Sequence, residues 1–80
     1  MCPTLHREDG FRFFVYSNEA DEPAHVHVSR AGGCAKLWLE PVSVAWHRGF
    51  RPPELRQVVY IVQRDRAELL EAWNEHRTRR

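Results

Sequence analysis

The sequence predicts an α+β domain, with an antiparallel sheet of three to four strands in the N-terminal half and helix in the C-terminal half. Residues 25–30 and 34–40 alternate between apolar and polar side chains, as expected of half-buried strands. From Leu55 to Trp73, apolar side chains instead recur at helical spacing beside charged flanks. A sheet covered on one face by helix satisfies both patterns.

The strands are expected at about 11–17, 24–30 and 34–40, with a possible fourth at about 42–46. The first is dense in aromatic and β-branched residues. The second and third are joined at Gly32-Gly33, a pair suited to a tight hairpin turn. Pro41 interrupts the chain before the fourth segment, which therefore belongs at a sheet edge.

The helical segment is expected at about 53–77. Pro52-Pro53 suits a first helical turn, where a missing N–H costs nothing. Asp65-Arg66-Ala67-Glu68 resembles a capping box and would begin a second helix. Because the apolar stripe stays nearly in phase across it, one kinked helix and two consecutive helices are both retained. Trp73 continues the stripe and is expected in the core.

Alternation assigns the two faces of the sheet. Val26 and Val28 mark the inward face of the second strand, so His25 and His27 must project from the other. Antiparallel neighbours would gather a patch there, and both imidazoles are expected to be at least partly exposed. Its predicted members are Arg12, Phe14, Tyr16, His25, His27, Lys36 and Trp38.

Three interpretations of this patch compete. His25 and His27 could supply two ligands to a divalent metal, although Cys34, Tyr16 and Glu40 do not complete a known ligand pattern. The patch could instead hold unstacked RNA bases. For RNA cleavage, His25 and His27 would be general base and acid, and Lys36 would stabilise charge. Arg12, Phe14, Tyr16 and Trp38 would bind the substrate. Finally, a protein partner or a second copy could cover the aromatic rings.

Length and composition bound these interpretations. Eighty residues make one domain, spanning 1–80, and the net charge of +1 creates no overall attraction to nucleic acid or to an anionic membrane. No apolar run approaches a membrane span, and the first residues lack the apolar core of a signal peptide. The two cysteines are isolated, which favours neither a zinc site nor a disulfide framework. A cytoplasmic location is expected.

The combined pattern resembles a family of small bacterial proteins described only as a domain of unknown function, number four-one-six-zero in that series. The resemblance lies in F-x-F-F-x-Y-S-N-E, P-x-H-V-H-V, A-K-x-W-L-E-P-V and L-L-E-A-W-N-E-H, spread between Phe11 and His76. It implies pairing with a second small protein in the manner of a type II toxin–antitoxin module, with some members labelled as the toxin. It implies no catalytic residue.

From the residues and the resemblance together, we expect the toxin component of such a module, acting on RNA through the His25/His27 face if it is an enzyme. A cognate antitoxin-like protein is the expected partner, and a homo-oligomer would cover the same rings. The alternative is a non-catalytic module that binds metal, nucleic acid or protein through this face.

Overall fold

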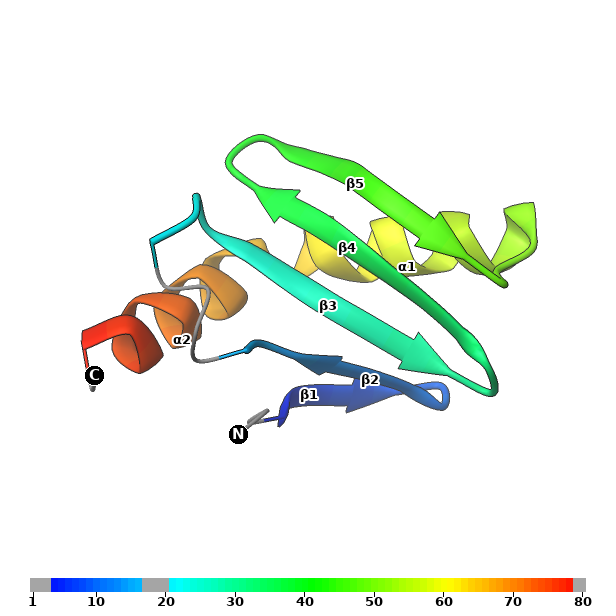
Figure 1. Cartoon of the computed structure of the whole chain (residues 1–80), viewed down its shortest axis with the longest axis horizontal. Helices are drawn as coiled ribbons and strands as arrows, with labels where there is room; N and C mark the ends of the chain where they lie inside the picture. The colour runs from blue at the N-terminus through cyan, green and yellow to red at the C-terminus, as the bar shows by residue number, and fades with distance from the viewer. Residues whose placement is uncertain (1–3, 17–20, 79–80) are drawn as a thin grey trace.

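The computed structural model of this chain describes residues 4–16 and 21–78. Five strands form one antiparallel sheet, in the order in which they occur along the chain. They are β1 (Thr4–Glu8), β2 (Phe11–Phe14), β3 (His25–Arg30), β4 (Gly33–Leu39) and β5 (Val42–Arg48). Two helices follow, α1 (Pro52–Arg64) and α2 (Arg66–Thr78); in Figure 1, α1 lies behind the sheet and α2 extends past its end at the start of β3. The predicted α+β architecture is confirmed.

The sheet has one more strand than the upper limit of the prediction. β1 was not predicted, and it pairs with β2 through the register His6↔Phe13 and Glu8↔Phe11. Asp9 and Gly10 join the two strands, with positive φ angles of 53° and 84°. Positive φ at both central residues is the geometry of a tight hairpin turn, for which Asp-Gly is a favoured pair. The strand predicted at 11–17 is shorter than expected, because β2 ends at Phe14 and leaves Val15 and Tyr16 outside it, while Ser17 lies outside the described residues.

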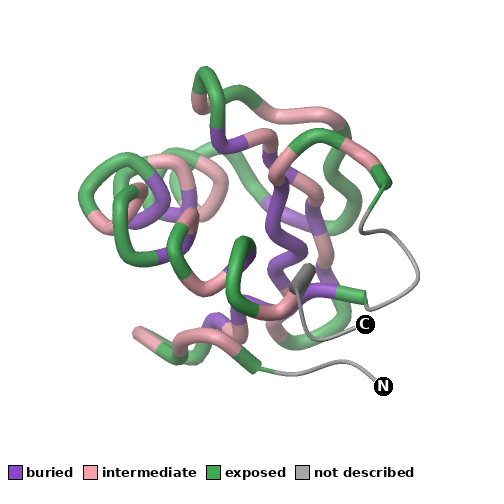
Figure 2. The backbone as a smooth tube through the Cα atoms, turned by 90° about the vertical axis from the view of Figure 1, so that its left-hand side faces the viewer, coloured by how far each residue is buried: buried purple, intermediate pink, exposed green. Residues whose placement is uncertain are grey.

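One face of the sheet packs against the helices and forms the core. Phe13, Val28 and Leu37 are fully buried there, and Val62 and Leu69 belong to the same apolar cluster. Figure 2 shows that the buried parts of the helical coils turn toward the buried strands. The inward orientation predicted for Val26, Val28, Leu37 and Leu39 is confirmed, because all four are buried in the same apolar cluster as side chains of the two helices.

The helical half consists of two helices rather than one. Asp65 separates them, with φ −102° and ψ 18°, and its N–H donates to the Ile61 carbonyl. α2 begins at the next residue, which agrees with the two-helix alternative of the prediction. At the start of α1, the Glu54 side chain accepts a hydrogen bond from the Arg51 N–H at 2.9 Å. Trp73 is 2% exposed, so its predicted burial is confirmed.

Within the described part of the chain, neither helix has the length and apolar character that crossing a lipid bilayer requires.

Candidate nucleic-acid interface

The sheet surface opposite the core brings the predicted site residues together. His25 pairs with Trp38 across β3 and β4, while His27 lies between Phe14 on β2 and Lys36 on β4. We call this surface the histidine face and define it by the outward strand positions. These are Thr4, Arg7, Arg12, Phe14, His25, His27, Ser29, Cys34, Lys36, Trp38, Ser43, Trp46 and Arg48, and Tyr16 joins them just after β2.

Aromatic rings pack closely around His27. Phe14 stacks on its imidazole with ring centroids 5.6 Å apart, and Tyr16 meets the same ring edge-on at 4.6 Å. Trp46 lies 6.3 Å away on the other side. Tyr16 and Trp46 are the outer members of this group, with 38% and 41% of their surface exposed. The predicted grouping therefore gains Trp46, which sequence reasoning had assigned only to a doubtful edge strand.

His25 lies deeper than His27. Its ring is 4.7 Å from the Trp73 ring of α2, 5.7 Å from Trp38 and 5.2 Å from His27. Nδ1 lies 2.9 Å from the carbonyl oxygen of Pro23, which can only accept a hydrogen bond. The Nδ1–H tautomer therefore fits this contact, and the bond orients the ring.

The predicted exposure of the two imidazoles is wrong. His25 is fully buried and His27 is 5% exposed, although both point away from the valines as predicted. Alternation along a strand tells which face a side chain occupies, but not how thickly its neighbours cover that face. Here aromatic rings from β2, β4, β5 and α2 cover the two imidazoles. His27 keeps a small exposed margin, whereas His25 has none.

The two predicted cations of the face are held in defined positions. Lys36 Nζ lies 2.6 Å from a Glu22 carboxylate oxygen and 4.7 Å from the centre of the Trp38 ring. The Arg12 guanidinium covers Phe14 at 4.5 Å, and its Nε donates to the Thr4 hydroxyl at 2.7 Å. Glu22 was not predicted, because it lies outside any regular pattern. It compensates part of the charge that Lys36 brings.

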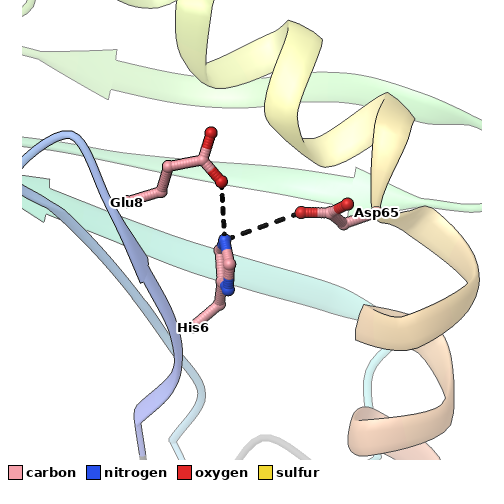
Figure 3. Close-up of side chains that lie close together, drawn as sticks. All are labelled: His6, Glu8 and Asp65. Carbon is pink, nitrogen blue, oxygen red and sulfur yellow. Dashed lines mark hydrogen bonds and ion pairs between the residues drawn. The ribbon is translucent and has the colours of Figure 1, made fainter.

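A second cluster of titratable groups lies at the other side of the sheet (Figure 3). His6 Nε2 is 3.0 Å from a Glu8 oxygen and 3.6 Å from an Asp65 oxygen. Among the described residues, these three form the one group of three or more His, Cys, Asp or Glu side chains with metal-ligand proximity. The predicted metal pair, His25 and His27, is not in it.

Arg64 explains the second cluster without a metal ion. Its guanidinium donates to both Glu8 oxygens and, at 3.0 and 2.8 Å, to Asp65. The hydrogen bond from Arg64, followed by that from His6, lowers the pKa of Glu8 from its ordinary 4.5 to about 2. The Arg64 hydrogen bond also lowers the pKa of Asp65. The cluster thus links β1 to the junction of α1 and α2 through hydrogen bonds and ion pairs.

This ion-pair cluster predicts a loss of stability in acid. A carboxyl whose folded pKa is depressed stabilises the fold above its unfolded pKa and loses that contribution as pH falls toward the folded value. The melting temperature should therefore fall between pH 4.5 and about 2, and less steeply in Glu8→Gln. The effect should be modest and weaken with salt, because the groups are at least partly open to solvent. Glu71→Gln, at an exposed position on α2, is the matched control. Parallel profiles for parent and Glu8→Gln would contradict the assignment.

These features define a small α+β domain whose sheet carries helices on one face and a cluster of rings and cations on the other. A family model described as a domain of unknown function, DUF4160, matches residues 10–74. The chain belongs to this family. No curated protein and no solved structure matches the chain.

Proposed function

We propose that this chain is the toxin component of a type II toxin–antitoxin module and that it acts on RNA through the histidine face. The observation that supports RNA as the target is the separation of charge in the fold. Among the described strand positions of the histidine face, four are cations and none is a carboxylate: Arg7, Arg12, Lys36 and Arg48. Acidic side chains lie instead at its margin, as Glu22 does, or with the helices.

This separation matters because the whole chain is nearly neutral, with a net charge of +1. Attraction to a polyanion must therefore come from a local surface. Exposed rings beside cations are also the means by which sheet proteins hold unstacked bases. The histidine face combines both features, with Tyr16 and Trp46 exposed beside His27.

For RNA cleavage, His27 is the imidazole placed to meet a substrate. As general base it would take the proton of a 2′-hydroxyl, whose oxygen then attacks the adjacent phosphorus and expels the 5′-oxygen. Lys36 would stabilise the negative charge that develops on the phosphate oxygens. His27 would then return the proton it took to the leaving 5′-oxygen, and His25, fully buried against His27, would position that ring.

A non-catalytic binding module is the second candidate, and two observations favour it. Catalytic imidazoles need contact with the substrate, but His25 is fully buried. Lys36 already has a carboxylate partner in Glu22 at 2.6 Å. Incubation of end-labelled RNA with the purified protein separates the candidates. Fragments ending in a 2′,3′-cyclic phosphate indicate cleavage, whereas a retarded but intact RNA indicates binding alone.

Expression of the isolated chain in a bacterium tests the toxin assignment. Induction should arrest growth, and co-expression of the cognate antitoxin-like protein should relieve the arrest. His27→Ala should abolish the arrest, because that side chain is the centre of the proposed site. His47→Ala is the matched control, since His47 is exposed and paired with Ala35, on the opposite side of the sheet.

Two results would contradict the proposal. Unimpaired growth of cells that accumulate folded parent protein would exclude a toxin. Full toxicity of His27→Ala would exclude His27 from the site. Circular dichroism must accompany the second test, because His27 is only 5% exposed and its loss affects packing.

A further inference from the structure

The strand register aligns the histidine face into rows that cross the sheet. Arg7 pairs with Arg12, Arg12 with Ser29, Ser29 with Cys34, and Cys34 with Arg48. These residues form one continuous row over all five strands, which we call the arginine row. The adjacent row, which we call the ring row, contains Phe14, His27, Lys36 and Trp46.

The arginine row has the dimensions and chemistry of a track for a nucleic-acid backbone. With strands about 4.8 Å apart, five strands spread the row over about 19 Å. Arg7 and Arg48 are exposed at its two ends, and the small side chains Ser29 and Cys34 form a partly exposed floor between the cations. The ring row runs parallel to the arginine row. On each of β2 to β5, the ring-row residue lies two positions from the arginine-row residue, which separates the two rows by roughly 7 Å.

Charge also favours an anionic ligand on this row. Arg7 and Arg12 are paired positions on β1 and β2, so two cations lie at one end of the row. A phosphate bound there would meet positively charged side chains from both strands.

We propose that a single-stranded RNA segment of about four nucleotides lies across the strands of the histidine face, within the range of single-strand sites on small sheet proteins. Its phosphates follow the arginine row, and its bases lie over the ring row. Trp46 and Tyr16 provide the exposed rings on which bases stack. This inference rests on the proposed function and specifies its substrate class. Duplex RNA does not fit, because its bases are already stacked on one another.

Fluorescence anisotropy with a labelled oligouridine of about eight nucleotides tests whether RNA binds along the arginine row and the ring row, a binding path that we call the track. Trp46→Ala should weaken binding roughly 5- to 150-fold, the equivalent of one lost base–ring stack. Arg48→Ala should weaken binding and lower the slope of log Kd against log salt by about 1, as expected for one lost phosphate contact. Tyr60→Ala and Arg56→Ala are the matched controls, because both residues are exposed on α1 behind the sheet.

Alkylation of Cys34 gives an independent test of the path. In a Cys2→Ser background, N-ethylmaleimide should modify Cys34 more slowly when the oligouridine is bound, because Cys34 lies in the middle of the arginine row. A duplex RNA of the same length should give no such protection. Unchanged alkylation under saturating oligouridine would overturn the proposed path.

The outcomes separate this inference from the proposed function. If the parent binds or cleaves RNA but Trp46→Ala and Arg48→Ala behave like the parent, the track is wrong and the proposed function stands. Equal affinity for duplex RNA likewise overturns the single-strand assignment. If the parent neither binds nor cleaves any RNA, the proposed function fails and the track fails with it.

Discussion

Trp73→Ala is expected to lower the free energy of unfolding by about 3–5 kcal/mol, the usual cost of deleting a large aromatic side chain from a core. Trp73 is 2% exposed, and its ring lies 4.7 Å from that of His25. Its truncation would leave a cavity between α2 and the start of β3. Because small domains are stable by only about 5–15 kcal/mol, the variant is expected to be largely unfolded at elevated temperature.

Urea denaturation followed by circular dichroism measures this effect. Asn74→Ala, at the exposed neighbouring position of α2, should behave like the parent. Trp73→Phe keeps an aromatic ring in place and should lose less stability than the alanine variant. It also keeps the test informative if Trp73→Ala does not fold. A denaturation midpoint equal to that of the parent for Trp73→Ala would show that the indole is not part of the core.

His25→Ala is expected to destabilise the fold by about 3 kcal/mol, although alternation alone would place this residue on the open face. The imidazole is fully buried, so its removal leaves a cavity. The substitution also removes the partner of the Pro23 carbonyl, which lies 2.9 Å from Nδ1. The loss of this hydrogen bond adds to the cost of the cavity.

Thermal and urea unfolding of His25→Ala should be compared with His47→Ala, which removes an exposed imidazole from β5. The control should stay within about 0.5 kcal/mol of the parent, as is usual for surface positions. His25→Phe preserves the ring volume but not the hydrogen bond, so its loss should be intermediate. Equal stability of parent and His25→Ala would mean that the ring is exposed in solution. Because His25→Ala is expected to be destabilised, a loss of its activity informs on the role of His25 only at temperatures where the variant is folded.

Local patterns predicted most of the sheet because strand side chains alternate strictly. Val26, Val28, Leu37 and Leu39 all lie in the core as alternation required. β1 was missed because Thr4–Glu8 has few apolar residues, and its pairing with β2 is what makes it a strand. The pair Asp9-Gly10 was the available signal, since Asp-Gly is a strong hairpin turn sequence.

The same contrast applies to the site. Alternation placed seven predicted residues on one face, and the register confirms that Arg12, Phe14, His25, His27, Lys36 and Trp38 lie there, with Tyr16 against His27. Trp46 was missed because the β4–β5 register shifts between Lys36 and Leu37, which places Trp46 on the face opposite Val42 and Val44. Glu22 was missed because it reaches the face from a loop. The cluster of His6, Glu8, Asp65 and Arg64 joins residues 56 positions apart, so no local pattern could indicate it.

By itself, the sequence determined the fold class, the two faces of the sheet and the identity of the side chains on the histidine face. Periodicity carries that information because a side chain's direction depends only on the local backbone. The tertiary structure alone decided that His25 is buried, that the arginine row is continuous over five strands, and that Arg64 joins β1 to the helices. Burial, register and ion pairing depend on residues distant in the chain, whose proximity arises only when the chain folds.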